Sequence, residues 1–190
     1  MSLPFRSIII LLGIFSLLGA QEAYICVWRN PERTMSKIFP DAFDYKTVNQ
    51  KISAAKRDTI EERLKGKLLP GQREVFTYYE LYNRDKKLLG YILAASQKGE
   101  YGAIEFIFGL DKDLKIKNIY IQRARERDTE FKKKDFLNQF LGKGVKDAPN
   151  LDKLIKGKRT TATSAIITGV KKELIAFEEL VLKMNKNGKR

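Results

Sequence analysis

Residues 103–121 read AIEFIFGLDKDLKIKNIYI, and this stretch decides the fold class. A run rich in isoleucine and phenylalanine leads into the polar group Asp111-Lys112-Asp113, and isoleucine then recurs at Ile116, Ile119 and Ile121. β-Branched and aromatic runs on either side of a short polar turn are typical of a β-hairpin. We therefore expect strands over residues 103–110 and 116–121, joined by a turn at 111–113.

Two further strands are expected ahead of this hairpin. Residues 75–82 read VFTYYELY, residues 89–95 read LGYILAA, and the polar group NRDKK separates them. Short strands with polar turns between them favour an antiparallel sheet. Apolar residues at helical spacing follow at 133–141 and 166–182, whereas residues 45–65 have mixed spacing with a helical second half. The sequence thus predicts an α+β fold: an antiparallel sheet of about four strands packed by two or more helices.

The last predicted helix begins at a cluster of small hydroxyl residues. Residues 159–174 read RTTATSAIITGVKKEL. Backbone N–H groups and the positive end of the helix dipole point outward at a helix start, which favours anions. The candidate phosphate ligands are Thr160, Thr161, Thr163 and Ser164, aided by the cations Lys158 and Arg159. Simple capping of the helix by one of these hydroxyls is the alternative.

Three smaller motifs precede this cluster along the chain. Residues 98–102 read KGEYG, residues 125–126 read RE, and residues 136–143 read FLNQFLGK. Their order resembles the FMN-binding domain found in the G subunit of the Rnf electron-transport complex and in the C subunit of sodium-translocating NADH:quinone reductase. The resemblance spans roughly residues 75–180. The family's glycine in the hydroxyl loop is missing here, and Arg127-Asp128-Thr129-Glu130 replaces the rest of its glutamate turn.

This resemblance implies an FMN-binding protein that takes part in electron transfer with redox partner proteins at a membrane. It implies that the hydroxyl cluster holds the phosphate, that Gly99 and Gly102 allow close approach of a planar ring, and that Glu126 lies near the flavin. The family can esterify its phosphate to a threonine or serine of the loop. The ungapped register places Ala162 at that position and forbids an ester, whereas the other register places Thr163 there. We expect non-covalent binding, with covalent attachment at Thr163 as the alternative.

Composition excludes several other kinds of chemistry. The 190-residue chain has no histidine and one cysteine, Cys26, so it has no Ser-His triad, internal disulfide or zinc–cysteine cluster. We find no acid–base dyad of the kind that hydrolysis requires.

The formal charge of +14 favours anionic partners. Two alternatives to the flavoprotein therefore remain: a flavin-free envelope module that binds another anionic ligand or partner, and a basic protein that contacts nucleic acid or membrane through distributed charge. We expect no specific nucleic-acid binding, since the aromatic residues fit a core and no RNA-recognition signature occurs.

The N-terminus has the pattern of a targeting segment. Arg6 precedes an apolar run from residue 8 to residue 20, which predicts a signal peptide or a membrane anchor over residues 1–20. We therefore expect the body of the protein in the cell envelope, outside the cytoplasm. The expected organisation is a connecting segment over 21–70, the FMN-binding-like domain over 71–182 and a basic tail over 183–190.

Overall fold

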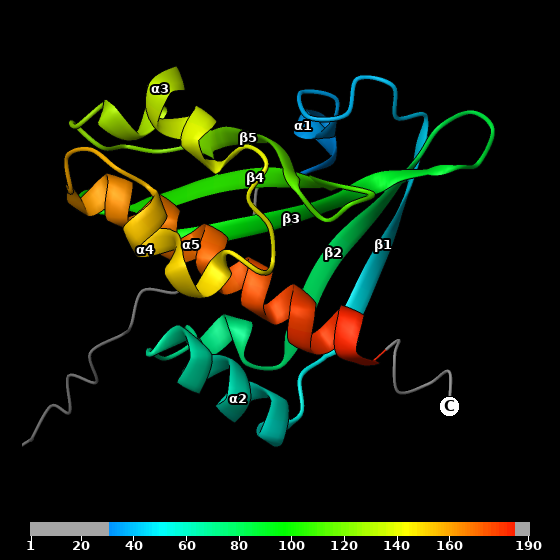
Figure 1. The fold of residues 1–190 in the computed structure, drawn as a ribbon, viewed down its shortest axis with the longest axis horizontal. Coiled ribbons are helices and arrows are strands. Elements are labelled where there is room, and N and C mark those ends of the chain that lie inside the picture. The colour runs from blue at the N-terminus through cyan, green and yellow to red at the C-terminus, as the bar shows by residue number, and fades with distance from the viewer. Residues whose placement is uncertain (1–30, 185–190) are drawn as a thin grey trace, which may run out of the picture.

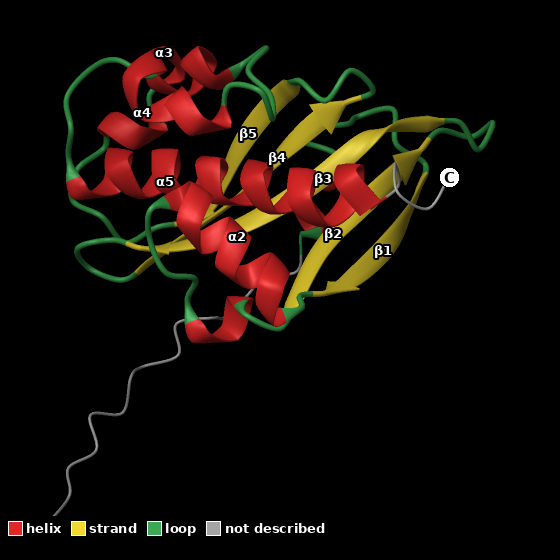
Figure 2. Ribbon diagram, turned by 60° about the horizontal axis from the view of Figure 1, so that its bottom comes forward, coloured by secondary structure: helices red, strands yellow, loops and turns green. Residues whose placement is uncertain are grey.

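A computed structural model describes residues 31–184 of the chain; the predicted leader, Cys26 and the tail beyond residue 184 lie outside these residues. The described part is built on a five-stranded antiparallel sheet with the strands in chain order (Figures 1 and 2). The strands are β1 (Asp44–Lys51), β2 (Val75–Tyr82), β3 (Leu88–Lys98), β4 (Ala103–Asp111) and β5 (Ile116–Arg123). The predicted α+β class, with its antiparallel sheet of about four strands, is confirmed.

The strand beyond the four expected is β1, which pairs with β2 from Asp44↔Tyr82 to Lys51↔Val75. It lies at the edge of the sheet, and most of its residues are exposed. An exposed edge strand needs no alternation of polar and apolar residues, so its sequence DYKTVNQK carries little strand signal. For this reason the apolar residues of this segment showed only mixed spacing, and the sequence did not predict a strand there.

The helices cover mainly one face of the sheet. The long helix α5 (Thr161–Phe177) crosses this face, continues into a π-helical turn at Glu178–Leu182, and packs beside α2 (Ala54–Leu64) and α4 (Leu151–Leu154) (Figures 1 and 2). The predicted helix over 133–141 is a short helix, α3 (Lys134–Leu137), followed by a 3₁₀ turn at Asn138–Phe140. Further 3₁₀ turns occupy Pro70–Gln72, Glu130–Lys132 and Ala148–Asn150. The short helix α1 (Glu32–Met35) packs on the opposite face, where Met35 and Phe39 join Ile92 and Ile107 in a smaller apolar cluster.

The main core lies between α5 and the sheet. Ile166, Val170 and Leu174 are completely buried against a cluster that includes Phe106 and Phe108. Gly169 lets the helix approach closely, because a Cβ atom at this position would lie 2.7 Å from Cζ of Phe106. This contact fixes α5 on the sheet and thereby fixes the position of its N-terminus.

The sheet opens between β2 and β3. Their pairing runs only from Tyr82↔Leu88 to Tyr78↔Leu93. In contrast, β1 pairs with β2 as far as Val75, and β3 pairs with β4 as far as Lys98↔Ala103. Residues 75–77 of β2 therefore pair with β1, and residues 94–98 of β3 pair with β4, but these two segments do not pair with each other. The side chain of Gln72 enters this region and donates a hydrogen bond from Nε2 to the carbonyl of Ser96 at 3.4 Å.

Within residues 31–184 no helix has the length and apolar character needed to cross a membrane.

Candidate functional site

The predicted hydroxyl cluster forms the first turn of α5. Thr160 is the N-cap residue, and its hydroxyl accepts a hydrogen bond from the N–H of Thr163 at 3.1 Å. The Thr163 hydroxyl accepts in return from the N–H of Thr160 at 2.8 Å and donates to the carbonyl of Lys158 at 3.0 Å. This reciprocal arrangement is a capping box, with threonine in the place of the usual glutamate. Two of the four predicted phosphate ligands therefore complete the helix start itself.

A carboxylate of the protein lies at this helix start. The Thr160 hydroxyl donates to Oδ2 of Asp128 at 2.5 Å, and the backbone N–H of Glu130 donates to Oδ1 of Asp128 at 2.9 Å. The pKa of Asp128 is lowered, chiefly because the Thr160 hydroxyl and the Glu130 N–H stabilise its charged form, with a smaller contribution from the charge of Lys158. The anion beside the start of α5 is thus a side chain of the same protein, held there through the Thr160 hydroxyl.

The other predicted ligands of the cluster lie in two different environments. Thr161, Ser164 and Lys158 are exposed, so their polar groups face solvent at the first turn of α5. Arg159 instead turns back to α4, where its guanidinium donates to the carbonyls of Asp152 and Ile155. Neither position considered for a phosphate ester faces solvent: Ala162 is 2% exposed and Thr163 is 1% exposed.

Gly99 and Gly102 form the tight turn between β3 and β4. The N–H of Gly99 donates to the carbonyl of Gly102 at 2.7 Å. The carboxylate of Glu126 closes this turn by accepting hydrogen bonds from the N–H groups of Glu100 and Tyr101 at 3.0 and 3.1 Å. A Cβ atom on Gly99 would lie 2.2 Å from Oε1 of Glu126, so this carboxylate has room only because residue 99 is glycine.

The two predicted halves of the site meet at residues 126–128, which we call the acidic connector. Glu126 binds the β3–β4 turn, and Asp128, two residues later, binds the N-cap of α5. Arg127, between them, places its guanidinium 4.9 Å from the centre of the Tyr101 ring. The structure therefore brings together Gly99, Gly102, Glu126 and the α5 hydroxyls, which are far apart in the sequence.

An open hollow lies along β5, the strand that precedes the acidic connector in the chain. It has a volume of about 510 Å³ and follows β5, with Arg123, Ala124, Lys132 and Leu137 in its lining. Ala124 precedes Glu126 by two residues. None of the residues that line the hollow belongs to the acidic connector, to the glycine turn or to the first turn of α5.

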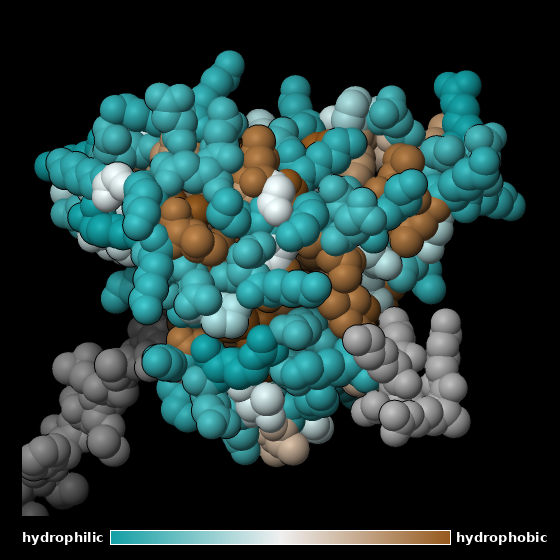
Figure 3. Space-filling view, viewed as in Figure 1, coloured by the Kyte–Doolittle hydropathy of each residue, from teal (hydrophilic) through white to brown (hydrophobic). Residues whose placement is uncertain are grey.

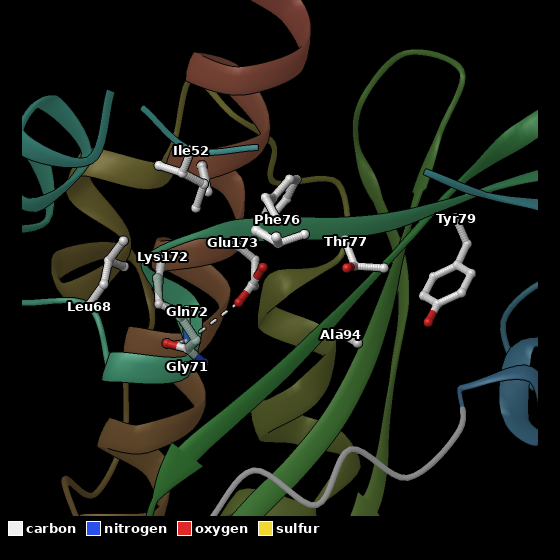
Figure 4. Close-up of a pocket in the computed structure, with 12 residues that line it drawn as sticks. Ile52, Leu68, Gly71, Gln72, Phe76, Thr77, Tyr79, Ala94, Lys172 and Glu173 are labelled. Atoms are coloured by element: carbon white, nitrogen blue, oxygen red, sulfur yellow. Dashed lines mark hydrogen bonds and ion pairs between the residues drawn. The ribbon is translucent and has the colours of Figure 1, made fainter. Parts of the chain in front are cut away.

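A second site was not foreseen from the sequence. A cavity of about 220 Å³ lies where β2 and β3 separate, and the charged and amide side chains in its lining are Gln72, Lys172 and Glu173 (Figure 4). Lys172 and Glu173 lie on α5 and are 4% and 5% exposed. In the sequence they are part of the run Lys171-Lys172-Glu173, which looks like an ordinary solvated helix surface. Both residues line this cavity, and no local pattern in the sequence reveals that the sheet opens here.

Within the described residues, no group of three or more acidic, cysteine or histidine side chains is arranged to hold a metal ion. No protein-family model and no curated protein matches the chain.

Proposed function

We propose that this protein is an extracytoplasmic FMN-binding protein that takes part in electron transfer. The observation that carries the proposal is the acidic connector, which joins the glycine turn to the start of α5 and so unites motifs that the sequence predicted as one site. The hollow along β5 is the space that we propose for the flavin ring. FMN would supply the redox chemistry, while the protein holds the phosphate and surrounds the ring.

The exposed polar groups of the first turn are the proposed phosphate ligands. Thr161 and Ser164 offer hydroxyl donors, and Lys158 offers a positive charge on the same turn. Thr160 and Thr163 have a different role, since their hydroxyls hold the turn in its helical shape. Asp128 opposes a second anion at this place, so binding of the phosphate requires its carboxylate to move away from Thr160 or to bind protonated.

We propose that FMN is held non-covalently. The support comes from Ala162, which has no hydroxyl, and from Thr163, whose hydroxyl is buried in the capping box. An absorbance spectrum of the purified protein before and after acid precipitation tests this directly. We expect flavin bands in the native protein and free flavin in the supernatant. Flavin that stays with the precipitate, and that Thr163→Ala releases, would contradict non-covalent binding.

The phosphate ligands are tested by comparing FMN with riboflavin, which lacks the phosphate. The double variant Thr161→Ala/Ser164→Ala should weaken FMN binding by about one to two decades, the equivalent of a charge-assisted hydrogen bond of roughly 1.5–3 kcal/mol. Riboflavin binding should not change. Thr168→Ala, an exposed hydroxyl later on the same helix, is the matched control. A chain that neither carries nor takes up FMN would refute the flavoprotein proposal.

The second candidate is a flavin-free envelope module that binds another anionic ligand or partner. It is favoured by one observation: Thr160 and Thr163 cap the start of α5, and Asp128 already places a carboxylate beside it. Absence of flavin uptake, together with saturable binding of another anion that Ser164→Ala weakens, would support it. Duplex binding that falls steeply with salt would instead favour the basic nucleic-acid-binding alternative.

Location outside the cytoplasm is part of the proposal and rests on the leader pattern around Arg6. Two reporters fused after Arg190 test it. A reporter that works only outside the cytoplasm should be active in this fusion. Activity of a reporter that works only in the cytoplasm would contradict the proposed location.

A further inference from the structure

We propose that the opening between β2 and β3 binds a small neutral molecule that has an apolar body and an N–H or O–H donor group. This site is distinct from the proposed flavin site. Lys172 lies twelve residues beyond Thr160 on α5, which corresponds to roughly 18 Å along the helix axis. The inference does not depend on flavin binding.

The shape of the cavity follows from the interrupted ladder. Phe76, Lys172 and Ala176 line it from the helical face of the sheet, whereas Thr77 and Ala94 belong to the opposite face. In a continuous sheet the backbone would separate these side chains. Here they share one cavity because β2 and β3 stop pairing at Tyr78↔Leu93.

Most of the lining is apolar. Ile52, Leu68, Val75, Phe76 and Ala176 contribute hydrocarbon surface, as Figure 4 shows for those that it labels. On the outer surface, Figure 3 shows apolar side chains gathered along the line where α5 crosses α2. A dry cavity of about 150 Å³ can hold benzene, and drug-sized molecules need about 300 Å³ or more. A volume of about 220 Å³ therefore suits a substituted single ring or a compact aliphatic molecule.

The polar end of the cavity is built from buried groups. Lys172 Nζ donates to Oε1 of Gln72 at 2.9 Å and lies 3.4 Å from Oε1 of Glu173. Gln72 is in turn oriented by its hydrogen bond to the Ser96 carbonyl. Figure 4 shows the Gln72, Lys172 and Glu173 head groups close together, with Leu68 on one side of them and Ala94 on the other. These contacts hold the polar atoms in place before any ligand arrives.

Glu173 determines the chemistry of the ligand. A carboxyl group has two oxygens that accept hydrogen bonds, and Lys172 is the ion-pair partner of one of them. A ligand with an N–H or O–H group supplies a further donor to this buried acceptor. A cationic donor is disfavoured because the Lys172 ammonium lies beside the carboxylate, so amides, alcohols and phenols fit best.

The proposal is tested with small probes of one size. Benzamide and benzyl alcohol carry a neutral donor, toluene carries none, and benzylammonium carries a positive charge. Their binding to the purified chain is followed by amide chemical shifts in two-dimensional NMR. We expect shifts around Leu68, Phe76 and Ala176, and benzamide binding about tenfold tighter than toluene binding. Benzylammonium should bind more weakly than benzamide.

Two variants locate the binding. Lys172→Met/Glu173→Leu replaces the buried ion pair by apolar residues of similar size, a change that proteins often tolerate. It should remove the preference for benzamide over toluene while apolar binding persists. Ala176→Leu should fill the cavity and abolish binding of both probes, whereas Thr168→Leu, on an exposed position of α5, should leave it unchanged. The proposal is overturned if a folded wild-type chain binds none of the probes, if toluene binds as tightly as benzamide, or if the double variant keeps the preference.

Discussion

Asp128 and Thr160 lie thirty-two residues apart in the sequence, yet the Thr160 hydroxyl donates a hydrogen bond to the Asp128 carboxylate at the first turn of α5. The helix dipole and Lys158 favour an anion at this position. Asp128 therefore lies beside Thr160, one of the hydroxyls that the sequence analysis assigned to a phosphate, and competition between its carboxylate and a bound phosphate can be measured.

Asp128→Asn should strengthen FMN binding if the phosphate binds at the start of α5, because a nearby negative charge is removed. We expect a gain of roughly fivefold, about 1 kcal/mol for a charge that is partly screened by solvent. Isothermal titration with FMN and with riboflavin isolates the effect, since riboflavin affinity should not change. Asp113→Asn, in the exposed β4–β5 turn, is the control. Equal gains for FMN and riboflavin would show that the phosphate binds elsewhere.

Thr160→Ala should destabilise the protein through loss of the capping box. Removal of an N-cap hydroxyl costs about 0.5–2 kcal/mol, and here the hydrogen bond to Asp128 is lost as well. Thr161→Ala changes the neighbouring exposed threonine and should alter the free energy of unfolding by less than about 0.5 kcal/mol. Urea denaturation measures both. Equal stability of the two variants would mean that the cap is not important for α5.

Gly169→Ala should be destabilising although alanine is the better helix former. The helix propensity favours alanine by about 1 kcal/mol, but its Cβ would lie 2.7 Å from Phe106 Cζ and 3.0 Å from Gln97 Cγ. Overpacking of this kind typically costs about 1–3 kcal/mol and should win. Thr168→Ala, which is exposed on the same helix, should be neutral or slightly stabilising. A thermal melt in which Gly169→Ala is the more stable of the two would contradict the close contact.

Gly99→Ala should act through Glu126. The new methyl group would displace the Glu126 carboxylate from the N–H groups of Glu100 and Tyr101, at a cost of about 1–3 kcal/mol. In a Glu126→Ala background there is no carboxylate to displace, so the same substitution should cost less than half as much. A double-mutant cycle by urea denaturation gives the coupling. Additive effects would show that the turn does not depend on this contact.

Glu173 predicts a pH dependence of stability. Burial raises the pKa of its carboxyl group, and Lys172 opposes this only in part. An acid whose pKa is higher in the folded state binds protons more tightly there, so ionisation above pH about 4.5 lowers the stability of the fold. Glu173→Gln removes this effect, and the stability of the variant relative to the wild type should rise as pH increases above about 4.5.

Asp128 has a lowered pKa, so Asp128→Asn should show the opposite trend. This variant should lose stability relative to the wild type as pH rises towards about 3.8.

The central strands were predictable because they are buried and apolar. The expected strand over 75–82 is β2 to the residue, and the expected hairpin over 103–121 is β4 and β5 with small shifts at the ends. The strand β1 was missed because an exposed edge strand carries no apolar alternation. The turn at Asp111-Lys112-Asp113 was recognisable because a short run of polar residues between two apolar runs is typical of a turn between two strands.

The candidate site was predictable in its parts but not in its connections. Local sequence indicated the helix start near Thr160, because capping depends on neighbouring residues. The tight turn at Gly99 and Gly102 was not predicted, since these glycines were expected only to allow close approach of a ring. The role of Asp128 depends on a contact between distant segments, and no spacing rule points to it. The cavity beside Lys172 and Glu173 depends on where two strands stop pairing, a property of the whole sheet.

The separation of β2 from β3 also divides the sheet into two units. The pair β1–β2 and the three strands β3–β4–β5 are joined by ladder pairs only from Tyr78↔Leu93 to Tyr82↔Leu88. The β1–β2 pair should therefore open before the rest of the sheet unfolds, and hydrogen exchange should be faster in β1 and β2 than in β3 and β4.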